Sequence, residues 1–172
     1  MEKVCQILEQ LVANGTLSGY AIGGATAAGF HGEPLATLDV DVFVFAESQP
    51  GALLVSLEPI YTELRRLGFT EHEKECVIVH GLPVQFIVAS SSLESEALRQ
   101  AQVERWEDKQ VRVMRPEHLA ALAIQTGRPK DRARVVYLLS LPQFNRAAFE
   151  EIARRHGLVS VWQRWKQELG LA

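Results

Sequence analysis

Cysteine, long apolar runs and an excess of positive charge are scarce or absent in this chain of 172 residues, and each shortage excludes a class of protein. The two cysteines, Cys5 and Cys76, stand far apart without CxxC spacing, so neither a disulfide framework nor a zinc site is expected. No stretch approaches the roughly 18 apolar residues of a membrane span, and the N-terminus lacks a signal-peptide pattern. A formal net charge of −3 argues against a general nucleic-acid-binding surface. We therefore expect a soluble, cytoplasmic protein with no membrane partner.

The composition that remains is that of a globular protein, with 47% hydrophobic and 23% charged residues. Apolar periodicity predicts strands at 20–22, 38–45, 77–79, 84–88 and 110–114, and helices at 4–12, 26–30, 53–67, 93–102, 117–125, 131–139, 146–156 and 161–169. Strands and helices mix over residues 1–114, and helices alone follow over 115–172. This order predicts an α+β fold, with a short mixed β-sheet flanked by helices and a C-terminal helical part packed on that core.

Two aspartates interrupt an otherwise apolar predicted strand. Asp39 and Asp41 are two residues apart, so in a strand both side chains point to the same face, about 7 Å apart. At an effective dielectric of about 20, two such anions repel each other by roughly 2 kcal/mol. A divalent cation would offset that repulsion, because hard cations bind carboxylate oxygens and bridge them to phosphates. The alternative is a strand at a sheet edge whose aspartates are simply in water.

A glycine pair, Gly23-Gly24, stands between a predicted strand and a predicted helix. Backbone without side chains can approach a phosphate closely there, with the N–H groups of the helix behind it. The alternative is that the pair only makes a turn. Gly24 and Gly29 also have the spacing of a P-loop, but Phe30-His31 stands where that loop needs Lys and Ser or Thr, which excludes a Walker-type site.

These features occur together in an order that resembles a known family. Gly23-Gly24, a spacer that ends in Ala36-Thr37, and Asp39-Val40-Asp41 resemble the signature of the DNA polymerase β-like nucleotidyltransferase superfamily. The spacing is similar to that of its small bacterial members, which include toxins of toxin–antitoxin pairs. A second segment, Arg115 to Leu119 followed by Gly127 to Asp131, is similar to the helical part that these proteins carry after the catalytic sheet.

The resemblance implies a nucleotidyltransferase fold and a reaction. Residues 1–114 would form the nucleotidyltransferase core, and the protein would use Mg²⁺ to transfer an NMP group from an NTP to a hydroxyl of a protein, RNA or small-molecule acceptor. The same resemblance implies a role for each matching residue: Asp39 and Asp41 would ligate the metal and act in catalysis with Gln85, and Gly23, Gly24, Thr37 and Lys130 would bind the nucleotide.

The sequence also departs from the family pattern. Gln85 stands where a third carboxylate is expected, and an amide is a neutral oxygen donor that cannot act as a general base. Three positions that are often charged in the family differ as well: they are Leu35, Ala123 and Arg134. An alternative function is therefore a catalytically impaired nucleotide- or protein-binding module, with a protein partner in a toxin–antitoxin pair as a third hypothesis.

Other polar residues carry weaker signals. The residues Arg128, Lys130, Arg132 and Arg134 form the one dense basic cluster, which is either a solvated helix start or a phosphate-facing surface. The histidines His31, His72, His80, His118 and His156 show no metal-ligand spacing, and we expect surface or packing roles, except that His31 could face the glycine-rich segment. Ser90-Ser91-Ser92 predicts a helix N-cap, and Trp162 and Trp165 are expected to pack the last helix against the body.

Overall fold

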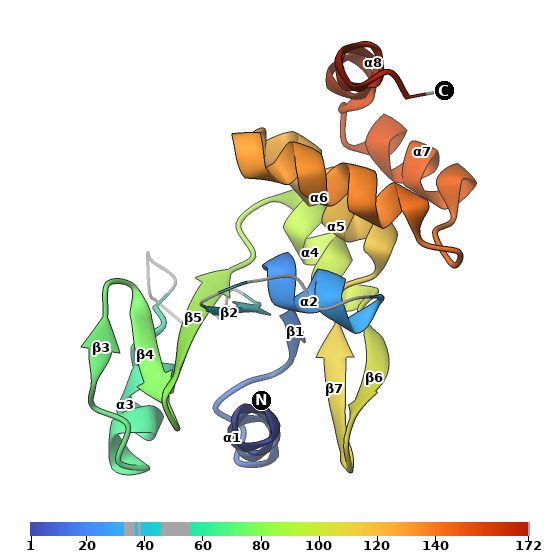
Figure 1. Ribbon diagram of the computed structural model, residues 1–172. Coiled ribbons are helices and arrows are strands. Elements are labelled where there is room, and N and C mark those ends of the chain that lie inside the picture. Colours follow the sequence, from blue (N-terminus) through green and yellow to red (C-terminus); the bar gives the residue numbers. More distant parts are fainter. Residues whose placement is uncertain (33–36, 38, 46–55, 172) are drawn as a thin grey trace.

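The computed structural model describes residues 1–32, 37, 39–45 and 56–171 (Figure 1). In that part of the chain, seven strands form one mixed sheet in the order β3-β4-β5-β2-β1-β7-β6. The strands are β1 Tyr20–Ile22, β2 Val40–Val44, β3 His72–Glu73, β4 Cys76–Val79, β5 Leu82–Val88, β6 Gln102–Trp106 and β7 Lys109–Val113. The predicted α+β fold class is confirmed.

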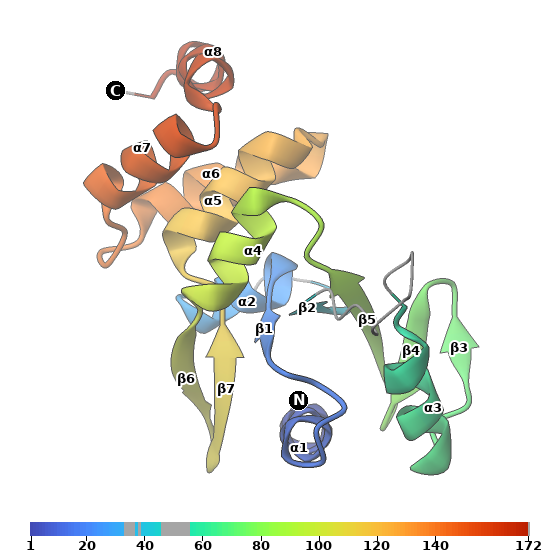
Figure 2. The same ribbon diagram turned by 180° about the vertical axis from the view of Figure 1, so that it is seen from behind.

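Eight helices accompany this sheet within the described residues. They are α1 Glu2–Ala13, α2 Gly24–Phe30, α3 Glu58–Arg66, α4 Ser92–Arg99, α5 Pro116–Thr126, α6 Pro129–Ser140, α7 Arg146–Arg155 and α8 Val159–Leu169. Figures 1 and 2 show α5, α6, α7 and α8 gathered on one side of the molecule, with α8 farthest from the sheet. None of these helices has the length and apolar character needed to cross a membrane.

Strand β2 lies inside the sheet, between β5 and β1. Its valines, Val40, Val42 and Val44, are buried, while the alternate residues Asp41 and Phe43 are only half-buried. This alternation is what a strand with one face against the core requires. The alternative that the acidic strand occupies a sheet edge is therefore wrong.

The predicted elements differ from the structure around residue 100. The helix expected over 93–102 ends at Arg99, and β6 follows, pairing antiparallel with β7. The sequence Gln-Val-Glu-Arg-Trp of β6 lacks a clear apolar alternation because β6 is an edge strand, and Val103 and Trp106 are exposed. The first residues of the helix expected over 53–67 lie outside the described part of the chain.

Helix α5 is the centre of the helical part. Almost every residue of it is buried, and its alanines let neighbouring helices approach closely: the buried residues are Pro116, Glu117, His118, Leu119, Ala120, Ala121, Ala123 and Ile124. It packs against α4, α6 and α7. On α8, Trp162 and Trp165 are 4% and 2% exposed, so their predicted packing role is confirmed.

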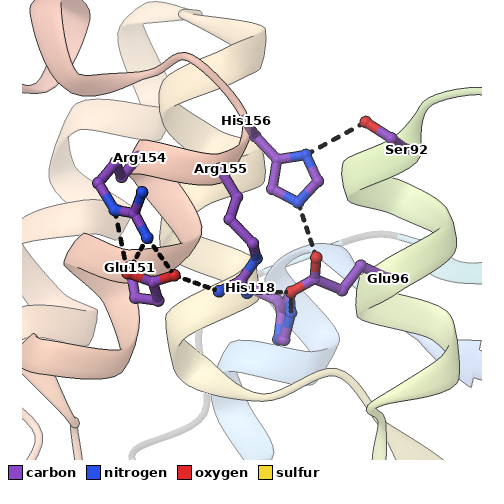
Figure 3. Close-up of polar contacts among 7 residues, drawn as sticks. All are labelled: Ser92, Glu96, His118, Glu151, Arg154, Arg155 and His156. Atoms are coloured by element: carbon purple, nitrogen blue, oxygen red, sulfur yellow. Dashed lines mark hydrogen bonds and ion pairs between the residues drawn. The ribbon is translucent and has the colours of Figure 1, made fainter.

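A polar junction ties α7 to α4 and α5 (Figure 3). The carboxylate of Glu96 on α4 accepts hydrogen bonds from Arg155 Nη2 at 2.6 Å, and it lies 2.8 Å from His156 Nε2 and 3.2 Å from His118 Nε2. Burial alone would raise the pKa of Glu96, but these three partners outweigh it and lower the pKa to about 2. Burial lowers the pKa of His118, and Glu96 only partly opposes this effect.

We expect this junction to make the protein sensitive to acid. Because the pKa of Glu96 is about 2 when folded and about 4.5 otherwise, the unfolded chain binds the proton first and stability is lost below pH 4.5. Burial of His118 also reduces the stability of the folded state below about pH 6.5, because its lowered pKa means that the unfolded chain binds the proton first. Between pH 4.5 and pH 3 the Glu96 contribution should fall by about 2 kcal/mol. Urea unfolding midpoints between pH 8 and pH 3 measure this loss.

Glu96→Gln is the matching control, since it keeps the size of the side chain and removes its titration. The variant should be less stable than the parent at pH 7, and its stability should fall less steeply between pH 4.5 and pH 3. If the stability of the two proteins fell equally steeply between pH 4.5 and pH 3, Glu96 would not control the loss of stability in acid.

Candidate active site

Strand pairing places two of the predicted site residues, Asp41 and Gln85, in one row across the sheet, with Gly23 beside Asp41. Strands β2 and β5 run parallel with Asp41 opposite Gln85. On the other side of β2, the N–H of Gly23 donates to the carbonyl oxygen of Asp41 at 2.9 Å. The antiparallel β4–β5 pairing, in which residue 77 faces residue 84, brings Cys76 opposite Gln85. Residues paired in this way share a face, so Asp41, Gln85 and the glycine turn lie together.

Gly24 is required where it stands. Its φ is +61°, and a Cβ built on it would lie 2.9 Å from Cγ of Asp41 and overlap Oδ2. A Cβ on Gly23 would lie 2.5 Å from Cε2 of Phe43. The glycine pair therefore allows the start of α2 to press against the carboxylate of Asp41, which is more than a generic turn needs.

Two threonines hold Asp39, one through its carboxylate and one through its backbone carbonyl. Thr37 Oγ1 donates to Asp39 Oδ1 at 2.9 Å, and Thr26 Oγ1 on α2 donates to the carbonyl oxygen of Asp39 at 3.0 Å. The structure thus places Thr37 beside Asp39, as an orienting group for the carboxylate. A cavity of about 250 Å³ adjoins this pair, between α2, the start of β2 and the side chain of Trp106.

Asp41 has an unfavourable environment for its negative charge. Burial raises its pKa, and the charge of Asp39 raises it further. Three positive charges from the start of α6 oppose this effect: Arg134, Arg128 and Lys130. These residues of the basic cluster therefore act on the aspartates, whereas Arg132 pairs with Glu168 at 2.6 Å.

A buried carboxylate organises the basic residues. Asp131 is fully buried, and it accepts hydrogen bonds from Arg128 Nε at 2.9 Å, from the Arg128 backbone N–H at 3.2 Å and from Arg134 Nη1 at 3.3 Å. This network fixes the first turn of α6 opposite the acidic strand. The sequence analysis treated Arg134 as a departure from the family pattern and missed this role, because its spacing to Asp131 alone does not distinguish a buried pair from a solvated one.

Gln85 has a partner that the sequence analysis also missed. Its Nε2 donates to Glu75 Oε2 at 2.7 Å, from the turn that precedes β4. The only sequence signal was the alternation of glutamates at positions 71, 73 and 75, which is equally typical of a solvated strand face.

His31 contacts Met114 and Glu104 rather than solvent. Its Nε2 lies 2.7 Å from the carbonyl oxygen of Met114, and its Nδ1 lies 3.9 Å from Glu104. The ring is buried and connects the end of α2 to the end of β7. These contacts give His31 a packing role, and the expectation that it could face the glycine-rich segment stays a prediction.

The donor atoms suit a hard cation. Asp39 and Asp41 offer carboxylate oxygens, and Gln85 can add an amide oxygen, which are ligands that Mg²⁺ or Ca²⁺ accepts. Burial and the charges of Asp39 and Asp41 raise the pKa of the Cys76 thiol. Across residues 1–32, 37, 39–45 and 56–171, no three Asp, Glu, His or Cys side chains gather as a metal-binding group.

Comparisons with known proteins identify the fold. No protein-family model matches the sequence, and no curated protein matches it. Among solved structures, an antigenic nucleotidyltransferase-like protein from Paracoccidioides brasiliensis aligns over 97% of this chain and 88% of its own, with a TM-score of 0.63 and 14% identity. ANT(2")-Ia in complex with adenylyl-2"-tobramycin aligns over 94% of this chain and 97% of its own, with a TM-score of 0.57 and 12% identity.

A solution structure of the antibiotic-resistance factor ANT(2'')-Ia gives a similar result, with a TM-score of 0.56, 11% identity and coverage of 96% of this chain and 92% of its own. At such low identity the likeness concerns the arrangement of the backbone and not individual residues. It extends over nearly the whole of every chain compared, including the helices that follow the sheet. The chain therefore has a nucleotidyltransferase-like fold.

Proposed function

We propose that this protein is a Mg²⁺-dependent nucleotidyltransferase that moves an NMP group from an NTP to a hydroxyl of an acceptor. One observation carries the proposal: Asp41 on the interior strand β2 and Asp39 just before it share the site with a glycine turn pressed against Asp41 and with positive charges from the start of α6. A structural neighbour in complex with an adenylylated compound, adenylyl-2"-tobramycin, supports transfer of a nucleotidyl group.

The proposed roles follow from charge and position. Asp39 and Asp41 would hold Mg²⁺, which would offset their mutual repulsion and neutralise charge on the phosphates when bound. Lys130 and Arg128 would attract the triphosphate, and the turn at Gly24 would leave room for it. The acceptor oxygen would attack the α-phosphorus in line, and pyrophosphate would leave as the new phosphoester bond forms.

Calorimetric titration of the four NTPs, with and without Mg²⁺, tests the proposal. We expect at least one NTP to bind only with Mg²⁺, and we expect Asp39→Ala and Asp41→Ala each to abolish that binding while the circular dichroism spectrum is unchanged. Asp108→Ala is the matched control, because this carboxylate lies on the exposed β6–β7 turn, and it should bind like the parent protein. Unchanged affinity in both aspartate variants would refute the assignment.

A non-catalytic function is the second candidate, and Gln85 is the observation that favours it. Such a protein would keep the fold as a nucleotide- or protein-binding module. If the site had lost activity only through the missing carboxylate, Gln85→Asp or Gln85→Glu should create or strongly raise nucleotidyl transfer. An unchanged transfer rate would argue that the missing carboxylate is not the only cause of the lost activity. The resemblance to toxins of toxin–antitoxin pairs and the cytoplasmic location stay predictions.

A further inference from the structure

Gln85 is held in a definite orientation by its neighbour Glu75. The carboxylate of Glu75 can only accept hydrogen bonds when ionised, so the group that faces it must be the NH₂ of the Gln85 amide. The distance of 2.7 Å from Nε2 to Oε2 is that of a strong, charge-assisted bond. The orientation of this amide, which otherwise could be flipped, is therefore fixed by chemistry.

The position of Glu75 determines where the amide oxygen lies. Glu75 directly precedes Cys76, which faces Gln85 from β4, while Asp41 faces Gln85 from β2 on the opposite side. In a planar amide the nitrogen and the oxygen occupy opposite branches. Because the NH₂ is directed to Glu75, Oε1 is the branch of the amide available to the β2 side, where Asp41 lies.

We infer that Glu75 is a positioning residue, which turns Gln85 so that its amide oxygen serves as the third ligand of the divalent cation held by Asp39 and Asp41. This inference rests on the proposed function. It explains why an amide can stand at this position: two carboxylates and one neutral oxygen balance the charge of a divalent cation. A carboxylate at position 85 would also be repelled by Glu75, whereas an amide is attracted to it.

Titration with Mn²⁺ alone tests the inference without requiring turnover, with binding monitored through the electron paramagnetic resonance signal of the free ion. We expect Gln85→Leu and Glu75→Ala each to weaken Mn²⁺ binding by about tenfold, which is the usual size of an effect on a group that orients a metal ligand. Glu75→Gln should stay within about threefold of the parent, because its amide oxygen still accepts the bond from Gln85. The double variant should be no weaker than Gln85→Leu.

Glu73→Ala is the matched control, since it removes an equal charge from the neighbouring strand β3 without touching Gln85. It should bind Mn²⁺ within about twofold of the parent. Equal losses in Glu75→Gln and Glu75→Ala would show that charge rather than positioning matters, and would overturn the inference. Unchanged affinity in Gln85→Leu would also overturn it.

The same titration separates this inference from the proposed function. Binding that disappears in Asp39→Ala and Asp41→Ala but is unaffected by Gln85→Leu would overturn the inference alone and leave the metal site in place. If the parent protein binds no Mn²⁺, both the proposed function and the inference are overturned.

Discussion

Gly24→Ala should lower the free energy of unfolding by about 3 kcal/mol and weaken Mg²⁺·NTP binding at least tenfold. A left-handed φ of +61° costs an alanine about 1 kcal/mol. The added Cβ must also displace the carboxylate of Asp41, against which Gly24 is packed. The binding loss follows because Asp41 can no longer hold its position, although both aspartates are still present. Urea denaturation and calorimetry measure the two effects.

Gly157→Ala separates the backbone cost from the steric one. Gly157 has a φ of +68°, and nothing lies within 4 Å of a Cβ built on it. The free energy of unfolding of this variant should fall by only about 1 kcal/mol, and the variant should bind nucleotide as the parent does. If the free energy of unfolding fell equally in the two alanine variants, the close approach of Gly24 to Asp41 would not contribute to the cost of the Gly24→Ala substitution.

Asp131→Ala should destabilise the protein by about 3 kcal/mol. The substitution removes a fully buried carboxylate and leaves Arg128 and Arg134 without their shared partner, and an uncompensated charge near the interior is costly. We also expect weaker nucleotide binding, because both arginines would lose the contact that orients them toward the acidic strand. Thermal and urea unfolding measure the first effect, and calorimetry measures the second.

The control is Glu168→Ala, which breaks an ion pair with Arg132 on the same helix. Both partners of that pair are about 40% exposed, so its loss should cost less than 1 kcal/mol. Nucleotide binding should be unaffected by this change. Comparable destabilisation by the two variants would mean that the burial of Asp131 does not set the strength of its network.

Local periodicity explains what the sequence could predict. Alternating valines on either side of Asp41 define β2, and Pro129 at the first position of α6, Pro142 and Gly157 mark the boundaries of the C-terminal helices. Each of these signals lies within a dozen residues, so it needs no knowledge of the tertiary structure. The acidic pair and the glycine turn are similarly local, and strand pairing then brings them together.

The features that escaped prediction depend on contacts between distant segments. Strand β6 is defined by its pairing with β7 rather than by its own polar sequence. Glu75 and Gln85 meet because β4 and β5 pair, and Glu96 meets His156 across 60 residues. The chemistry of a carboxylate depends on what surrounds it, and spacing along the chain does not reveal those surroundings.

The position of α6 opposite the acidic strand links ligand binding to the docking of the helical part on the sheet. The aspartates lie on β2 and directly before it, and the positive charges come from a helix that begins some ninety residues later, so the complete site exists only in molecules whose helical part is docked. Thermodynamic linkage then requires reciprocity: whatever binds across this gap stabilises the docked arrangement by the same free energy that docking adds to its affinity. In such a protein a bound ligand stabilises the contact between the sheet and the helices, and its release weakens that contact.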